Sequence, residues 1–138
     1  RVAGHVAIAP MVSPLMCGGS LARNEATSLF PVRTILWAWA QYLRDAPPHT
    51  WDWRVSGLLA TDAQLRAVSP GIVTTHTLDV LCDEARAYAA RLAEVGTLHA
   101  LRELPYTHGS ALGFGTIMRT VADLMDSRLA QAAVEAEA

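Results

Sequence analysis

Three short apolar runs are spaced along the chain, and longer amphipathic stretches separate them. They lie within residues 1–10, 71–77 and 97–104, and the second run is rich in β-branched side chains. Runs of this length and composition are typical of strands that are buried in a sheet. The pattern therefore predicts three strands, the first of them over residues 5–10.

Between the first two runs, apolar side chains recur at three- and four-residue steps, as on the buried face of an amphipathic helix. Ser28 can cap this helix, Pro31 suits its first turn, and the Pro47-Pro48 pair would end it. We predict residues 11–27 as a loop and a short helix at 62–67. The predicted buried stripe of the long helix is Leu29, Val32, Leu36, Trp39 and Leu43.

Two more helical stripes follow the second and third runs. One extends from Leu81 to Val95 and stops before Gly96, a residue type favoured just after a helix. The other marks a last helix, whose tail after Gln131 is rich in alanine and glutamate. We expect this tail to fray, as chain ends commonly do. The stripe of the last helix contains Ile117, Val121, Leu124 and Arg128.

The predicted order is strand, helix-rich insert, strand, helix, strand and helix. Alternation of this kind favours a parallel sheet with covering helices, so the predicted fold class is α/β. A chain of 138 residues can form one domain with its own core. We expect a single domain over residues 1–138, with the insert at 28–69 and the strand–helix–strand–helix part at 71–131.

Composition narrows the possible functions. A formal net charge of -2 without a basic block gives no reason to expect nucleic-acid binding, and the apolar runs are too short for a membrane span. Cys17 and Cys82 lie far apart and form no disulfide or metal-binding pattern, which favours a cytoplasmic location. The histidines other than His108 show no metal-ligand spacing, so we expect neither a metal nor another cofactor. These histidines are His5, His49, His76 and His99.

Residues 79–84, Asp-Val-Leu-Cys-Asp-Glu, resemble the Asp-Pro-Leu-Arg-Asp-Glu motif of the bacterial hormone-sensitive-lipase-like esterases of the α/β-hydrolase superfamily. In that family the first aspartate, just after a strand, is the acid of the catalytic triad. His108-Gly109 is similar to the family's catalytic His-Gly pair, which comes after the next strand. Further positions that fit the family spacing are Ser20, Asn24, Trp37, Trp39, Tyr42, Leu43, Tyr88, Leu92 and Gly96. The main departures from the pattern are Val80, Cys82 and Ser110.

The resemblance implies the C-terminal portion of an α/β-hydrolase fold with part of a helical cap. It implies hydrolysis of small, short-chain carboxylic esters, with Asp79 as triad acid and His108 as base. The family's Gly-x-Ser-x-Gly nucleophile elbow and its glycine-rich oxyanion loop do not occur in the sequence and would precede residue 1. We therefore expect the N-terminal part of the same fold to complete the sheet, either as a separate chain or as preceding residues.

The two predicted catalytic residues suit this chemistry. A serine needs a histidine to take its proton, and the histidine needs a carboxylate to fix its tautomer. Loops that follow adjacent parallel strands meet at the carboxyl edge of the sheet, where Asp79 and His108 would lie together. The order of acid before histidine also matches the order in α/β-hydrolases.

Some candidate residues have simpler interpretations. Asp79, Asp83 and Glu84 could be acids in the first turn of a helix, and for Asp83 and Glu84 this interpretation is favoured. Ser20 follows two glycines, but it lies in a predicted loop and lacks the glycine that follows the serine in a nucleophile elbow. It is therefore a poor candidate for the nucleophile. Trp37 and Leu81 are predicted to contact substrate, although packing of Trp37 against the sheet is the favoured alternative.

Two other functions remain open at this level. One is a non-catalytic α/β-hydrolase-like module for binding or interaction, which the altered acidic motif supports. The other is an unrelated doubly wound domain with an acidic ligand site around Asp79.

Overall fold

The computed structural model describes residues 2–44 and 52–137. Strands β1 (His5–Ile8), β2 (Gly71–His76) and β3 (Leu98–Leu104) pair in parallel in the order β1-β2-β3. The three predicted strands and their parallel arrangement are therefore confirmed. Residues 45–51 of the predicted 28–69 insert lie outside the described residues. They include the Pro47-Pro48 pair, His49 and Trp51.

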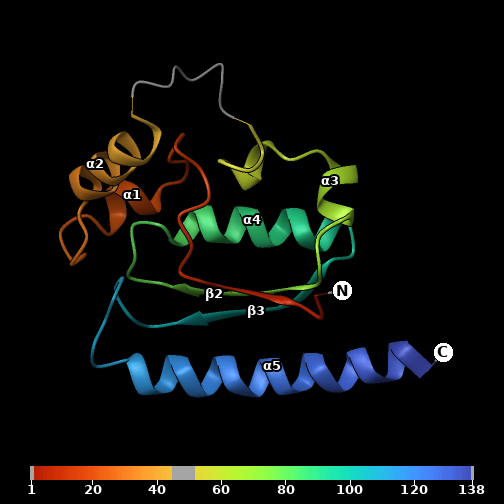
Figure 1. The fold of residues 1–138 in the computed structure, drawn as a ribbon. Coiled ribbons are helices and arrows are strands. Elements are labelled where there is room, and N and C mark those ends of the chain that lie inside the picture. Colours follow the sequence, from red (N-terminus) through yellow and green to blue (C-terminus); the bar gives the residue numbers. More distant parts are fainter. Residues whose placement is uncertain (1, 45–51, 138) are drawn as a thin grey trace.

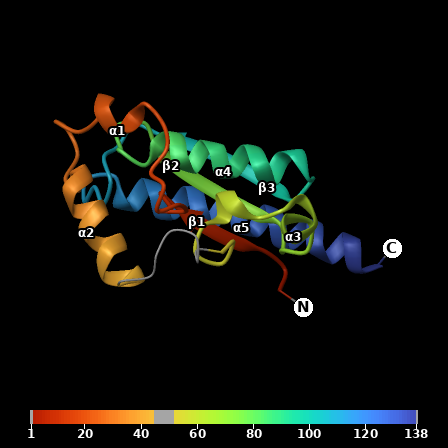
Figure 2. The same ribbon diagram turned by 90° about the horizontal axis from the view of Figure 1, so that it is seen from above.

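Two helices cover the sheet, one on each face (Figure 1). Helix α4 (Cys82–Glu94) lies on one face and α5 (Phe114–Glu137) on the other. Every residue of β2 is buried, as expected of a parallel strand between two helical layers. The view from above shows α4 over β2 and β3, with β1 at the edge of the sheet that α4 leaves open (Figure 2). One core cluster consists of Ala60, Leu65, Val73, Ala85, Ala89 and Leu92.

The parallel register brings the ends of β2 and β3 together, because His76 pairs with Leu104. Main-chain hydrogen bonds continue past the strands. The Thr77 amide donates to the Leu104 carbonyl over 2.9 Å, and the Leu78 amide donates to the Tyr106 carbonyl over 3.1 Å. The loops that carry the predicted acid and base are therefore held side by side.

The described residues between β1 and β2 form α1 (Ser20–Arg23), α2 (Val32–Leu43), the 3-10 helix η2 (Gly57–Leu59) and α3 (Asp62–Arg66). Helix α1 interrupts the predicted loop. Helix α2 starts at Val32 and not after Ser28, because the Glu25 carboxylate accepts the Val32 amide hydrogen over 2.8 Å and so caps it.

The buried face of α2 agrees in part with the predicted stripe. Trp39 is buried as predicted, and Val32 and Leu43 pack against the same cluster, whereas Leu29 and Leu36 are exposed and Ile35 is buried instead. The reason is tertiary, since α2 packs against Val80 and Leu81 just before α4, and that contact selects the face. Helical periodicity therefore indicated the amphipathic helix and most of its buried side correctly but chose Leu36 in place of Ile35.

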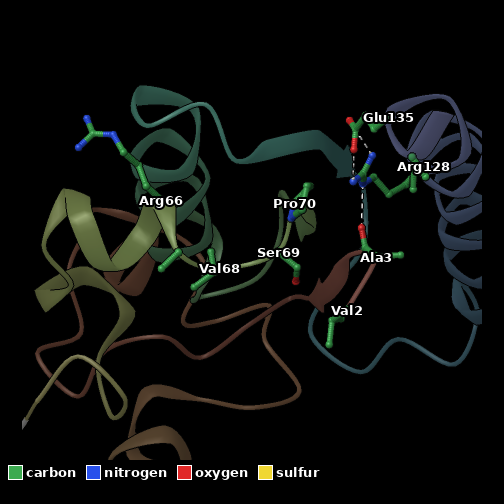
Figure 3. A pocket seen from close by; sticks show the side chains of 11 residues that line it. Val2, Ala3, Arg66, Val68, Ser69, Pro70, Arg128 and Glu135 are labelled. Atoms are coloured by element: carbon green, nitrogen blue, oxygen red, sulfur yellow. Dashed lines mark hydrogen bonds and ion pairs between the residues drawn. The ribbon is translucent and has the colours of Figure 1, made fainter. Parts of the chain in front are cut away.

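The C-terminal tail of α5 is helical to Glu137, so the prediction that it frays is wrong. The Arg128 guanidinium holds the Glu135 carboxylate through two hydrogen bonds of 3.1 and 2.9 Å, and its Nε donates to the Ala3 carbonyl over 2.9 Å (Figure 3). These contacts tie the end of α5 to the segment before β1. Ala3, Arg128 and Glu135 also line a cavity of about 630 Å³, which lies at the start of the strands and away from His108.

No helix within residues 2–44 and 52–137 combines enough length with enough apolar character to cross a membrane.

Candidate active site

Asp79 lies in the short connection between β2 and α4, and its side chain is fully buried. Its amide donates to the His76 carbonyl over 3.0 Å, which forms the turn at the strand end. Its Oδ1 accepts the Leu81 amide hydrogen over 3.0 Å, just before the first turn of α4. A carboxylate at this position benefits from the positive end of the helix dipole.

His108 lies in the turn after β3 and faces Asp79. Its Nδ1 is 2.7 Å from Asp79 Oδ2, and because a carboxylate accepts, Nδ1 is the donor. The Phe30 ring meets the imidazole edge to face, with centroids 5.0 Å apart. Gly109 has φ of 64°, and a Cβ there would lie 3.1 Å from Phe30 Cε2. The structure thus brings the predicted acid and base into a hydrogen-bonded pair.

Asn24 holds the loop that carries Asp79 in place. Its side-chain amide donates to the Thr77 carbonyl over 2.9 Å and to the Asp79 carbonyl over 2.8 Å. The side chain is buried, so both hydrogen bonds are shielded from water. Sequence reasoning noted only the spacing of Asn24 and missed this role, because its partners lie more than 50 residues away.

Ser20 is also bound to the start of α4 and is not free to attack a substrate. Its hydroxyl donates to the Val80 carbonyl over 2.8 Å and accepts the Asp83 amide hydrogen over 3.0 Å. The Asp83 carboxylate in turn accepts the Ser20 amide hydrogen over 2.8 Å. Gly18, with φ of 109°, allows this approach, since a Cβ there would lie 2.4 Å from Asp83 Cβ. Ser20 and Asp83 act together as a reciprocal cap.

Asp83 and Glu84 both occupy the first turn of α4, as predicted, but Glu84 is only 1% exposed. Its Oε1 accepts the amide hydrogens of Val12 and Ser13, each over 2.6 Å. Burial outweighs these two bonds and raises the pKa of Glu84 to about 7. The residue therefore anchors the loop after β1 as well as starting a helix.

The two predicted substrate-contact residues lie apart. Leu81 is buried against Ile35 and Trp39, and Trp37 is 63% exposed. Trp37 therefore does not pack against the sheet, so that alternative is wrong. Contact of Leu81 and Trp37 with a substrate stays a prediction.

An apolar cavity of about 630 Å³ adjoins His108. It lies between the end of β1, the end of β2 and the start of α5, at the edge where open α/β sheets bind ligands. In residues 2–44 and 52–137, no three His, Cys, Asp or Glu side chains converge as the ligands of a metal would. Side chains that line the cavity belong to Ile8, Ala9, His76, His108, Ser110, Ala111, Phe114, Ile117 and Met118.

Comparison with known families gives a match to one family model. The model described as alpha/beta hydrolase fold matches residues 1–112, which include the Asp79–His108 pair. Among curated proteins, the chain is 39% identical over 82 residues to the carboxylic ester hydrolase LipN of Mycobacterium tuberculosis. That alignment covers 59% of this chain and 21% of LipN.

Solved esterase structures have the same fold. The bacterial heroin esterase superposes with a TM-score of 0.78 at 25% identity, over 92% of this chain and 42% of its own. Brefeldin A esterase, described as a bacterial homologue of human hormone sensitive lipase, gives a TM-score of 0.71 at 24% identity, over 99% of this chain and 39% of its own. The chain thus spans about a fifth of the curated relative and about two fifths of these structures.

Proposed function

The chain belongs to the alpha/beta hydrolase fold family, and on that premise we propose that it is the C-terminal part of a carboxylic ester hydrolase with Asp79 and His108 as triad acid and base. The predicted resemblance to hormone-sensitive-lipase-like esterases and the predicted fold class are confirmed by the matches. The observation that carries the catalytic proposal is the 2.7 Å contact between His108 Nδ1 and Asp79 Oδ2.

In the proposed reaction, His108 Nε2 takes the proton of a serine hydroxyl as that oxygen attacks the ester carbonyl. His108 then gives the proton to the leaving alcohol as the ester C–O bond breaks, which leaves the acyl group on the serine. His108 next takes a proton from a water molecule that attacks this acyl-serine, and returns it to the serine oxygen as the acid is released. Asp79 keeps the proton on Nδ1, so that Nε2 carries the lone pair, and stabilises the imidazolium as it forms. The Leu81 amide holds the Asp79 carboxylate in place for this task.

We infer that polypeptide on the N-terminal side of β1 supplies the serine and the oxyanion donors. The amides of His5 and Ala9 face β2, so those of Val6 and Ile8 point toward the open edge of the sheet. The Val6 and Ile8 side chains are 36% and 40% exposed, which leaves apolar surface beside that edge. A strand paired there would end next to the cavity that Ile8 and His108 line.

The substrates we propose are small esters with short acyl chains. The cavity beside His108 is lined mainly by apolar side chains, among them Ile8, Phe114 and Met118. Such a lining suits the hydrocarbon part of an acyl group, which binds by leaving water.

A chromogenic short-chain ester assayed with the complete protein tests the proposal. Asp79→Asn and His108→Ala should each lower kcat by at least about a thousandfold, as loss of a triad member does. The matched control is His99→Ala, at the beginning of β3, which should leave kcat near the wild-type value.

Turnover that persists in His108→Ala would remove this residue from the mechanism. A complete, folded wild-type protein that hydrolyses no ester would favour the alternative of a non-catalytic binding or interaction module. The changed motif positions Val80 and Cys82 are the observation behind that alternative.

A further inference from the structure

A second histidine, His76, lies close to the proposed base and has no part in the mechanism above. It is the last residue of β2, three positions before Asp79, and it is 2% exposed. It lines the same cavity as His108. A buried imidazole at this position calls for a physical account, because burial of a polar ring without hydrogen bonds is costly.

The His76 side chain binds the turn that carries His108. Its Nδ1 lies 3.1 Å from the carbonyl oxygen of Thr107, the residue immediately before His108. A carbonyl can only accept, so Nδ1 carries the hydrogen. The ring also meets Tyr106 edge to face, with centroids 6.2 Å apart. His76 therefore contacts the two residues that precede His108.

This side-chain contact begins where the main-chain contacts between the two loops end. The last backbone hydrogen bond from the β2 loop to this turn is donated by the Leu78 amide to the Tyr106 carbonyl. Beyond it, the next carbonyl of the turn, that of Thr107, accepts from His76 Nδ1 and also from the Ser110 amide over 3.3 Å. The bond from Ser110 closes the turn that contains His108 and Gly109, whose φ is 64°, and the bond from His76 ties this closed turn to β2. Because glycine permits many backbone conformations, the position of the turn depends on such a tie.

His76 keeps this role in its neutral form. Its Nε2 is buried and has no hydrogen-bond partner among the described residues, so a proton there would be poorly solvated. Burial lowers the pKa of His76, and nearby His108 acts in the same direction, while Asp79 and the bond to Thr107 oppose the shift. The neutral ring with hydrogen on Nδ1 is thus the form that suits its surroundings.

We propose that His76 is a positioning residue, which fixes the Thr107 carbonyl and thereby holds the imidazole of His108 in line with Asp79. As a contribution to catalysis, this inference rests on the proposed esterase function. A misplacement of about 1 Å in a reacting group can cost on the order of a hundredfold in rate, so an anchor one residue from the base has a measurable effect.

Two amide variants of the complete protein separate positioning from packing. In His76→Asn, the amide nitrogen falls where Nδ1 lies and can still donate to Thr107. In His76→Gln, it falls near the position of Nε2 and cannot. We expect H76Q to lower kcat by about ten- to a hundredfold with KM changed less than about twofold, whereas H76N stays within about threefold of wild type.

A spectroscopic measurement gives a readout that does not depend on turnover. The hydrogen shared by His108 Nδ1 and Asp79 should give a far-downfield proton NMR signal at neutral pH. The signal should persist in H76N and weaken or disappear in H76Q. If the wild type shows this signal but hydrolyses no ester, the proposed function fails. The signals of H76N and H76Q would still show whether His76 positions His108.

Three results would overturn the inference. The first is a wild-type kcat and NMR signal in folded H76Q. The second is an equal loss in H76Q and H76N, which would indicate a purely structural role. The third applies even if the variants do not fold: ring-nitrogen NMR shifts of the wild type that place the His76 hydrogen on Nε2 would exclude the bond to Thr107.

Discussion

Asp79 and Glu84 lie in one six-residue motif, and both carboxylates are buried, yet their surroundings differ. The two Asp79 oxygens have separate partners, the His108 ring and the Leu81 amide. Glu84 uses Oε1 for two amides, while its Oε2 is buried without a hydrogen-bond partner among the described residues. Charge on Asp79 is thus matched by donors, whereas charge on Glu84 is only partly compensated.

The raised pKa of Glu84 makes folding stability depend on pH. Between the ordinary glutamate pKa of 4.5, which applies to the unfolded chain, and the folded-state pKa of about 7, the folded protein binds a proton at Glu84 that the unfolded chain has lost. The unfolding free energy should therefore fall as pH rises through this window, by up to about 3 kcal/mol. Glu84→Gln should remove this contribution to the pH dependence of the unfolding free energy. Between pH 4.5 and 7, the unfolding free energy of the wild type should therefore fall relative to that of the variant.

Denaturant unfolding of both proteins at several pH values measures the effect. The matched control is Glu94→Gln in the last turn of the same helix, where the side chain is 67% exposed. Parallel stability curves for wild type and E84Q would contradict the prediction. Groups such as Asp83 and Glu103, whose pKa values are lowered, act at lower pH and are common to both proteins.

Among the elements, α5 shows how a single contact extends a helix. Alanine and glutamate favour helix, but the last turns of an isolated helix fray. In α5 the Arg128 guanidinium binds Glu135 two turns further on and also binds Ala3. The two ends of the chain are therefore coupled through one buried side chain.

Arg128→Met should lower the unfolding free energy by about 1–2 kcal/mol, because the Ala3 carbonyl loses its donor while half-exposed Glu135 regains water. Amide hydrogen exchange of residues 131–137 should also become faster. Arg119→Met is the matched control, since the hydrogen bond of Arg119 within the described part of the chain is an exposed one of 3.3 Å to Thr116. If the amides of residues 131–137 exchanged equally slowly in R128M and R119M, the proposed coupling of the tail to Ala3 through Arg128 would be excluded.

At the scale of the whole molecule, the sheet is covered unequally. Its two faces carry α4 and α5 over β2 and β3, and β1 forms the less covered of its two edges (Figure 2). Apolar side chains are exposed near this edge on β1 and along α5: Val6, Ile8, Phe114, Met125 and Leu129. Completion by an N-terminal part of the same fold is our proposal for this surface. The 1–138 domain boundaries and a cytoplasmic location stay predictions.

The 138-residue chain expressed alone should self-associate through this edge, because unpaired strands with apolar neighbours recruit further strands. Val6→Lys should reduce the association, whereas Val134→Lys, on an exposed turn of α5, should not. Sedimentation velocity over a range of protein concentrations measures the outcome. A monodisperse wild-type monomer would contradict both this prediction and the proposed completion of the sheet.

The features that the sequence alone determined are those encoded locally. Strand composition and helical periodicity identified β1, β2, β3, α4 and most of α5, because these signals arise from side chains within one element. The acidic motif and the His-Gly pair pointed to Asp79 and His108, since both follow strands whose ends must share one edge of the sheet. The family matches agree with the predicted fold and family, and the catalytic roles of Asp79 and His108 stay a prediction.

Only the tertiary structure decided which polar groups are buried and what they bind. Glu84 contacts Val12 from 72 residues away, His76 contacts Thr107 from 31, and Arg128 contacts Ala3 from 125. The buried side of α2 and the length of α5 depend on contacts of the same long-range kind. No pattern within a single element contains these contacts, because each arises only when the packing of the sheet and its helices brings distant residues together.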